Sequence, residues 1–142
     1  KDPHNLGACM RTACAAGVDA IIVNRSNSVS ITSTVSKVAC GAAEIVPLIR
    51  VKSLKKVLIW MGEYGINRIG TSENASENLF EKNIKGHTLL VMGEEHSGIS
   101  NMAQKNCDNL LKIPIKGNLS SLNLSVATGI CLFEINRKNS IS

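Results

Sequence analysis

Aromatic residues are scarce in this chain. Phe, Trp and Tyr together make up 3% of its 142 residues. The core must therefore be built from aliphatic side chains, and a broad aromatic platform for stacking nucleobases, as in many single-strand binders, is not expected. The apolar fraction of 44% is nevertheless large enough to bury a single core.

The cysteines follow no pattern typical of a disulfide framework or a zinc site. Their number, five, is odd, and no C-x-x-C pair occurs. This favours a reducing compartment in which several cysteines serve as small buried apolar residues. No apolar run is long enough to span a bilayer, and no signal peptide is visible. We therefore expect a cytoplasmic protein with no membrane segment and no bound metal ion.

Positive charge is present but not concentrated. The net charge is +5, and no run of five like charges forms a basic arm. This balance permits binding to a polyanion such as RNA, although solubility alone explains it equally well. The sequence also lacks G-x-G-x-x-G and G-x-x-x-x-G-K-[ST], so a dinucleotide enzyme or a P-loop enzyme has no support.

Extended and helical patterns alternate along the chain. Strands are predicted at residues 20–24, 45–51, 66–70, 88–92 and 110–115. Helices are predicted at 6–16, 34–44, 53–65, 102–107 and 123–138, and 71–87 reads as a polar loop around a short helix. The alternation predicts an α/β fold, a mostly parallel sheet flanked by helices, in one domain spanning 1–142. In such sheets, ligands bind beyond the carboxyl ends of the strands.

The first segment with chemical potential is DPHNLGACMRTACAAG, residues 2–17. Asn5 can cap the helix, and Gly17 can end it. Gly7 lets the first turn approach a ligand. Arg11 is the one charged residue on a helix of small residues. It is either an ordinary surface arginine or a clamp for phosphate or carboxylate, for which the guanidinium group is suited.

The second segment is MGEEHSGIS, residues 92–100, directly after the apolar strand 88–92. Gly93 and Gly98 permit close backbone approach, and the carboxylate of Glu95 lies between them. Taken alone, the segment is either a connecting loop before a capped helix or the edge of a ligand site.

The third segment, IPIKGNLSSLNLSVATGICLFEINR, covers residues 113–137. Its GNLSS stretch is too polar for a core and too rich in small residues for a plain connector. Ser121 or Asn123 can cap the helix that follows. That helix carries an apolar stripe that we expect to face the core: Val126, Ile130 and Phe133.

In this order, the three segments resemble the three motifs of the TrmH/SpoU family of SPOUT RNA methyltransferases. The first motif, N-x-G-x-x-x-R-T-A, is matched by Asn5, Gly7, Arg11, Thr12 and Ala13. The second, G-x-E-x-x-G, is matched by Gly93, Glu95 and Gly98. The third, I-P-x-x-G followed by S-L-N-x-S-V-A, is matched by Ile113, Pro114, Gly117, Ser121, Leu122, Asn123, Ser125, Val126 and Ala127. The ending SSLNLSVATGICLFE is most similar to the bacterial 23S rRNA guanosine 2′-O-methyltransferases of the family.

The resemblance implies an enzyme that transfers a methyl group from S-adenosylmethionine to a ribose 2′-hydroxyl in RNA, here a guanosine of 23S rRNA. It implies a SPOUT fold in which roughly residues 88–138 form a deep trefoil knot. It also implies a homodimer with the active site at the subunit interface.

The resemblance further assigns roles to individual residues. Gly93, Ile113 and Leu122 would contact the cofactor through their backbone. Arg11 would act on the 2′-hydroxyl, with Glu95 orienting Arg11 or a partner across the dimer. The remaining group would hold ribose, loop or arginine by hydrogen bonds: Asn5, Ser121 and Asn123.

One further feature bears on the function. The chain starts at the first motif, so we expect the strand before it and any N-terminal RNA-recognition domain to be absent.

Two alternative functions stay open: a tRNA 2′-O-methyltransferase and an RNA-binding module that has lost catalysis. The second alternative is opposed by four intact motif residues: Asn5, Arg11, Glu95 and Asn123.

Overall fold

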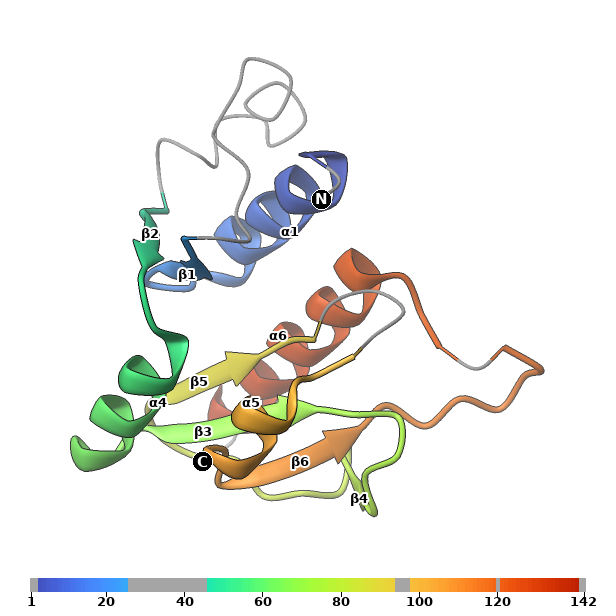
Figure 1. Ribbon diagram of the computed structural model, residues 1–142. Coiled ribbons are helices and arrows are strands. Elements are labelled where there is room, and N and C mark those ends of the chain that lie inside the picture. Colours follow the sequence, from blue (N-terminus) through green and yellow to red (C-terminus); the bar gives the residue numbers. More distant parts are fainter. Residues whose placement is uncertain (1–2, 26–45, 94–97, 120, 141–142) are drawn as a thin grey trace. The chain divides into compact units, whose positions relative to one another are not determined.

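The computed structural model describes residues 3–25, 46–93, 98–119 and 121–140 (Figure 1). The predicted helix at 34–44 lies outside these ranges. The chain forms two compact units, residues 1–54 and 55–142, and each is described on its own.

In the first unit, helix α1 spans Pro3–Ala16. Proline is favoured in the first turn of a helix, where its missing N–H has no partner to lose. Asn5 therefore lies inside the helix, and its prediction as the capping residue is wrong. The end of the helix is as predicted: Gly17 has φ of 75°, a left-handed conformation that glycine adopts without strain.

Helix α1 packs on a small parallel sheet of β1 (Ile21–Asn24) and β2 (Leu48–Val51), in which Ile21 is paired with Leu48. Met10 is completely buried at this contact. The second predicted strand is shorter than expected because Pro47 precedes it. The Pro47 carbonyl accepts a hydrogen bond from the Ile21 N–H at 2.9 Å. Pro47 therefore contributes to the pairing of β1 and β2 as an acceptor, although it has no backbone N–H to donate.

The second unit contains a four-stranded sheet with the order β4-β6-β3-β5. Its strands are β3 (Asn67–Thr71), β4 (Glu77–Asn78), β5 (Thr88–Val91) and β6 (Asn109–Lys112). All three pairings are parallel. The predicted α/β class, a parallel sheet flanked by helices, is thereby confirmed.

Helices cover both faces of this sheet (Figure 1). One face carries α4 (Leu54–Glu63) and α5 (Asn101–Lys105), and the other carries α6 (Leu124–Ser140). Successive strand residues alternate between the two cores, as strand geometry requires. In β5, Leu90 contacts the α6 side, while its neighbours Leu89 and Val91 contact the α4–α5 side.

The segment 72–87 contains no helix, so the short helix predicted there is wrong. The segment consists of turns around β4. The Asn78 side chain accepts a hydrogen bond from the Phe80 N–H at 2.9 Å, and Ser72 accepts one from the Asn74 N–H at 3.2 Å. Such local side-chain acceptors compete with helical hydrogen bonds and stabilise turns instead.

The apolar stripe predicted on the last helix faces the core only in part. Ile130 packs against the core, whereas Val126 and Phe133 are each 51% exposed. The buried residues of α6 are Thr128, Cys131, Glu134, Ile135 and Lys138. Apolar spacing alone did not locate the whole buried face of α6, because that face includes polar residues whose polar atoms have partners inside the fold. The Thr128 hydroxyl, for example, donates a hydrogen bond to the Leu124 carbonyl at 2.7 Å.

The core contains no aromatic residue among those described as buried, which confirms the expected aliphatic core. Cys131 is completely buried, and burial raises the pKa of its thiol to about 12, so it remains a neutral apolar side chain. No helix among the described residues is long and apolar enough to cross a membrane.

Candidate functional site

The carboxyl ends of β5, β3 and β6 lie side by side at one edge of the sheet in the second unit. Two hydrogen bonds hold these ends together. The Thr71 hydroxyl donates to the Met92 sulfur at 3.6 Å, and the Ser72 N–H donates to the Leu111 carbonyl at 2.9 Å. This is the edge at which a parallel α/β sheet binds ligands.

Gly93 is fixed by backbone packing just beyond β5. A Cβ at Gly93 would lie 2.2 Å from the carbonyl carbon of Gly98 and 2.3 Å from the Ile99 nitrogen. Because real Cβ atoms do not approach a backbone so closely, no other residue fits without a shift of the chain. The sequence suggested a flat ligand as the reason for this glycine, whereas contact with the returning chain is already sufficient. Glu95 lies outside the described residues.

A hollow of about 300 Å³ lies beyond β6. Its lining is formed by Glu73, Lys112, Ile113, Pro114, Ile115 and Leu119. Ile113, predicted as a cofactor contact, is half-buried and also packs on the α6 core. The sequence analysis missed Glu73, although its position two residues after β3 places it at the carboxyl edge. Apolar walls beside a carboxylate suit a ligand that combines apolar and cationic parts.

Asn123 forms the N-cap of α6. Its side-chain oxygen accepts hydrogen bonds from the N–H groups of Ser125 at 2.9 Å and Val126 at 3.4 Å. Of the two predicted caps, Asn123 is therefore the one used, and Ser121 remains exposed before the helix. Leu122 is half-buried between them. The helix start beside the third motif is thus held in place by a motif residue.

Arg11 belongs to the other unit, as does Asn5. It lies on α1 next to the buried Met10, and its side chain is exposed. No hydrogen-bond or ion-pair partner for Arg11 occurs within residues 3–25 and 46–54. The side chain of Asn5 lies outside the described part of the structure.

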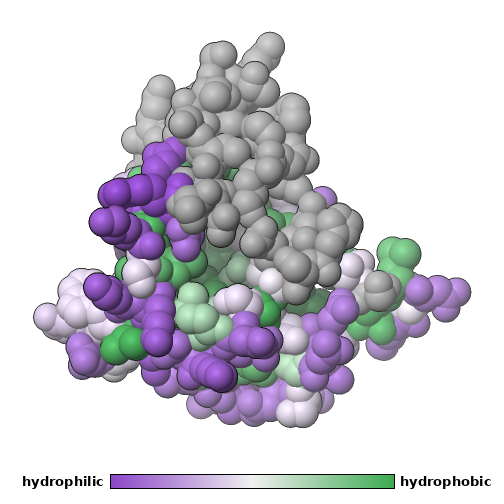
Figure 2. All heavy atoms as spheres, in the orientation of Figure 1, coloured by the Kyte–Doolittle hydropathy of each residue, from purple (hydrophilic) through white to green (hydrophobic). Residues whose placement is uncertain are grey.

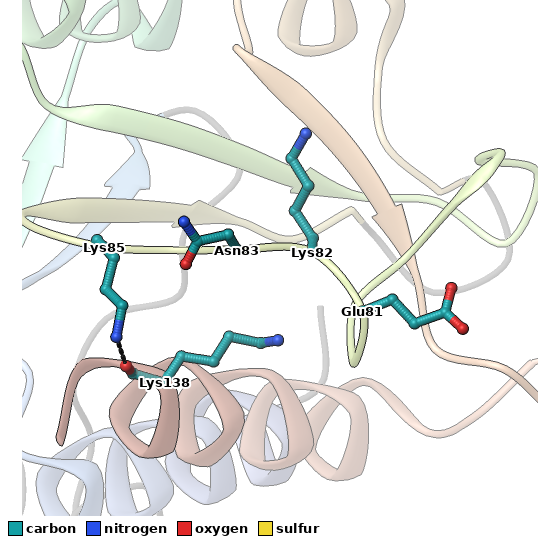
Figure 3. A pocket seen from close by; sticks show the side chains of 5 residues that line it. All are labelled: Glu81, Lys82, Asn83, Lys85 and Lys138. Atoms are coloured by element: carbon teal, nitrogen blue, oxygen red, sulfur yellow. Dashed lines mark hydrogen bonds between the residues drawn. The ribbon is translucent and has the colours of Figure 1, made fainter. Parts of the chain in front are cut away.

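A second hollow, of about 290 Å³, lies between α6 and the segment leading into β5 (Figure 3). Its lining is formed by Glu81, Lys82, Asn83, Lys85 and Lys138. Three ammonium groups make it a second candidate for an anionic ligand. Each of them is already engaged: Lys82 with Glu77 at 2.9 Å, Lys85 with the Lys138 carbonyl, and Lys138 with the Phe80 carbonyl at 3.0 Å.

Lys138 also pairs with the buried carboxylate of Glu134 at 3.3 Å. Arg137 donates two hydrogen bonds to the same carboxylate, at 2.9 and 2.8 Å. Chiefly because of the Arg137 hydrogen bonds, and then that of Lys138, the pKa of Glu134 falls to about 2. The second hollow, named the lysine hollow, is therefore lined by a structural network of ion pairs and hydrogen bonds that ties α6 to the rest of the unit.

Comparisons by sequence and by structure both find RNA methyltransferases. The model of the SpoU rRNA Methylase family matches residues 1–133. The 23S rRNA (guanosine-2′-O-)-methyltransferase RlmB of Pseudomonas aeruginosa is 50% identical over 137 residues, which cover 96% of this chain and 55% of that protein. RlmB of Escherichia coli is 50% identical over 139 residues, covering 98% of this chain and 57% of that protein.

Solved structures agree. The SpoU methyltransferase AviRb from Streptomyces viridochromogenes, in complex with AdoMet, has a TM-score of 0.88 at 30% identity, covering 96% of this chain and 54% of that one. An AdoMet-bound rRNA methyltransferase from Sinorhizobium meliloti has a TM-score of 0.88 at 31% identity, covering 96% and 52%. The chain thus spans about half the length of the relatives it matches.

Proposed function

Since this chain belongs to the SpoU rRNA methylase family, we propose that it is the catalytic part of an RNA methyltransferase. The enzyme transfers a methyl group from S-adenosylmethionine to the ribose 2′-hydroxyl of a guanosine in 23S rRNA. The observation that carries the proposal is the 50% identity to RlmB over 96% of the chain. Residues 1–142 then form one SPOUT catalytic domain.

The hollow beyond β6 is the proposed cofactor site. When bound, S-adenosylmethionine supplies the methyl group. Ile113 provides an apolar wall of this hollow, and we propose that Leu122 and the backbone at Gly93 complete the site. The Glu73 carboxylate carries the charge opposite to that of a sulfonium or an amino group, and Lys112 carries the charge opposite to that of the cofactor's carboxylate, so the lining fits this cofactor chemically.

Arg11 acts by electrostatics and positioning in this proposal. A guanidinium group stays protonated in proteins and cannot serve as a base. Arg11 instead holds an RNA phosphate and the 2′-hydroxyl together, so that a phosphate oxygen accepts the hydroxyl proton, and it stabilises the negative charge that develops on the hydroxyl oxygen. Glu95 orients this guanidinium or a partner across the dimer, while Asn5 and Ser121 hold ribose. Asn123 holds the start of α6, which fits its observed role as a cap.

We further propose a cytoplasmic homodimer whose C-terminal part is knotted. The dimer is supported by Val126 and Phe133, which are seven residues apart, lie on one face of α6 and are each half exposed. A second copy covering this face removes apolar area from water. The knot is supported by the family match over residues 1–133, because the resemblance to this family implies it.

Arg11→Ala tests the proposal in a methyl-transfer assay on 23S rRNA from cells lacking the modification. Removing a positioned charge-stabilising group costs about 100-fold in rate or more. We expect that loss with unchanged affinity for S-adenosylmethionine by calorimetry. An undiminished rate would contradict the assigned role of Arg11, and methylation of tRNA in place of 23S rRNA would correct the substrate. If the wild-type protein did not bind S-adenosylmethionine, an RNA-binding module that has lost catalysis would explain the chain better.

A further inference from the structure

The outer face of α4 and the residue directly after it carry the only aromatic pair found in the described part of the chain. Trp60 is 53% exposed and Tyr64 is 70% exposed. Their ring centroids lie 5.0 Å apart with an interplanar angle of 66°, an edge-to-face contact. In this geometry each ring keeps at least one face that the other ring does not cover. We propose that Trp60 and Tyr64 form a stacking site for unpaired bases of the RNA substrate.

The fold does not require these two rings. Helix α4 is attached to the sheet through Leu58, which is 2% exposed. The Arg68 guanidinium packs against Gly62, where a Cβ would lie 2.6 Å from its central carbon, and donates to the Leu58 carbonyl at 3.1 Å. These contacts use the side of the helix opposite to Trp60. The aromatic pair is therefore exposed on a helix that is already anchored.

The charges around the pair favour a polyanion. Lys56, Trp60 and Tyr64 follow one another at intervals of four residues. Tyr64 is the first residue after α4, and its N–H still donates to the Trp60 carbonyl at 3.3 Å, so the three form one ridge that ends just beyond the helix. Lys55 and Lys56 are exposed at its start, and Glu63 is the one carboxylate on this outer side of α4. In the part of Figure 2 where α4 lies, purple hydrophilic side chains adjoin pale and green ones.

This combination matches single-stranded RNA better than a second copy of the chain. Bases stack on aromatic faces while lysines attract the phosphates beside them. A two-fold contact in which the two ridges run parallel would bring the lysines of both copies together, which is unfavourable. The inference rests on the proposed function, because it assigns part of RNA recognition to a surface remote in sequence from the three motifs.

Trp60 is the only tryptophan of the chain, so its fluorescence reports on the site directly. The experiment titrates an unstructured oligoribonucleotide into the protein and follows Trp60 emission, with the anisotropy of a labelled RNA as an independent measure of binding. We expect quenching that parallels RNA binding. Trp60→Leu should weaken RNA binding about five-fold or more, since stacking contributes about 1–3 kcal/mol per base.

Phe80→Leu is the matched control, because Phe80 is 44% exposed but stands outside α4. It should leave RNA affinity unchanged, and all variants should bind S-adenosylmethionine like the wild type. RNA binding without quenching, with equal affinity in Trp60→Leu, would overturn the stacking site and leave the proposed function intact. A blue shift that depends on protein concentration without RNA would assign the ridge to a protein contact and also overturn it. Quenching by RNA without any methyl transfer would uphold the site and reject the proposed function.

Discussion

The two hollows of the second unit are almost equal in size, about 300 and 290 Å³, yet they differ in what their charged groups do. In the lysine hollow every ammonium group already has a partner within the fold. In the hollow beyond β6, no hydrogen bond or ion pair of the Glu73 carboxylate is found among the described residues, and its neighbours in the lining are Lys112 and four apolar residues: Ile113, Pro114, Ile115 and Leu119. The volume of a hollow does not distinguish a binding site from a structural network here. What distinguishes them is whether the charged groups of the lining already have partners within the fold.

The largest effect is expected from Gly93→Ala at the carboxyl edge of the sheet. The new Cβ would meet the backbone at Gly98 and Ile99, which cannot move as a flexible side chain can. We expect the free energy of unfolding to fall by about 3 kcal/mol or more. Gly117→Ala is the control, because a Cβ there meets nothing within 4 Å and should change stability by less than about 0.5 kcal/mol. Urea unfolding measures both, and equal stabilities would refute the packing argument.

Substitutions in the lysine hollow should change the free energy of unfolding and leave cofactor binding unchanged. Lys138→Met leaves the buried Glu134 with Arg137 as its remaining partner, and it removes the hydrogen bond to the Phe80 carbonyl. We expect a loss of about 2–3 kcal/mol, below the about 3–5 kcal/mol for a buried ion pair that loses its partner, because Arg137 still pairs with Glu134. Lys82→Met breaks an exposed pair and should cost less than about 1 kcal/mol. A comparable loss in the two variants would mean that Lys138 is no more structural than a surface lysine.

The hollow beyond β6 should respond in ligand affinity. Leu122→Asp places a carboxylate against the apolar wall of the proposed site, so we expect about ten-fold weaker binding of S-adenosylmethionine, or about 1.4 kcal/mol. Calorimetry on the folded variant measures this loss. Lys138→Met should bind the cofactor with wild-type affinity. The reverse result, weak binding in Lys138→Met alone, would move the site to the other hollow.

The smallest effect is expected from pH. The pKa of Glu134 is lowered to about 2 by Arg137 and Lys138, so its ionised form stabilises the fold above its ordinary pKa of 4.5. That stabilisation is lost as pH falls from about 4.5 toward 2. The stability difference between the wild type and Glu134→Gln should therefore shrink over this range. If this difference in stability stayed constant down to pH 2.5, the ionised Glu134 carboxylate would not be the group that stabilises the fold.

Much of the fold was predictable because strands and helices of this chain follow their simplest patterns. The apolar run 88–92 predicted β5, and Gly17 marked the end of α1. The errors arose where a side chain makes a contact that spacing does not encode. Asn78 stabilises a turn where a helix was expected, and Pro3 starts α1 ahead of Asn5.

The candidate site was only partly predictable for a related reason. Motif spacing located Gly93, Ile113 and Asn123, but it attributed the glycine to a ligand when packing against Gly98 and Ile99 is sufficient, and it left the cap undecided. Glu73 and Lys138 belong to no motif, and their roles depend on neighbours distant in sequence. The exposure of Phe133 was missed because an apolar face that meets a core and one that stays open to solvent have the same spacing.

Amide chemical shifts recorded during a titration with S-adenosylmethionine would test the central claim most directly. We predict that the largest changes occur at Gly93, Ile113 and Leu122, around the hollow beyond β6, while Lys85 and Lys138 stay unchanged. Changes concentrated at Lys85 and Lys138 would contradict the assignment of the cofactor to the carboxyl edge of the sheet.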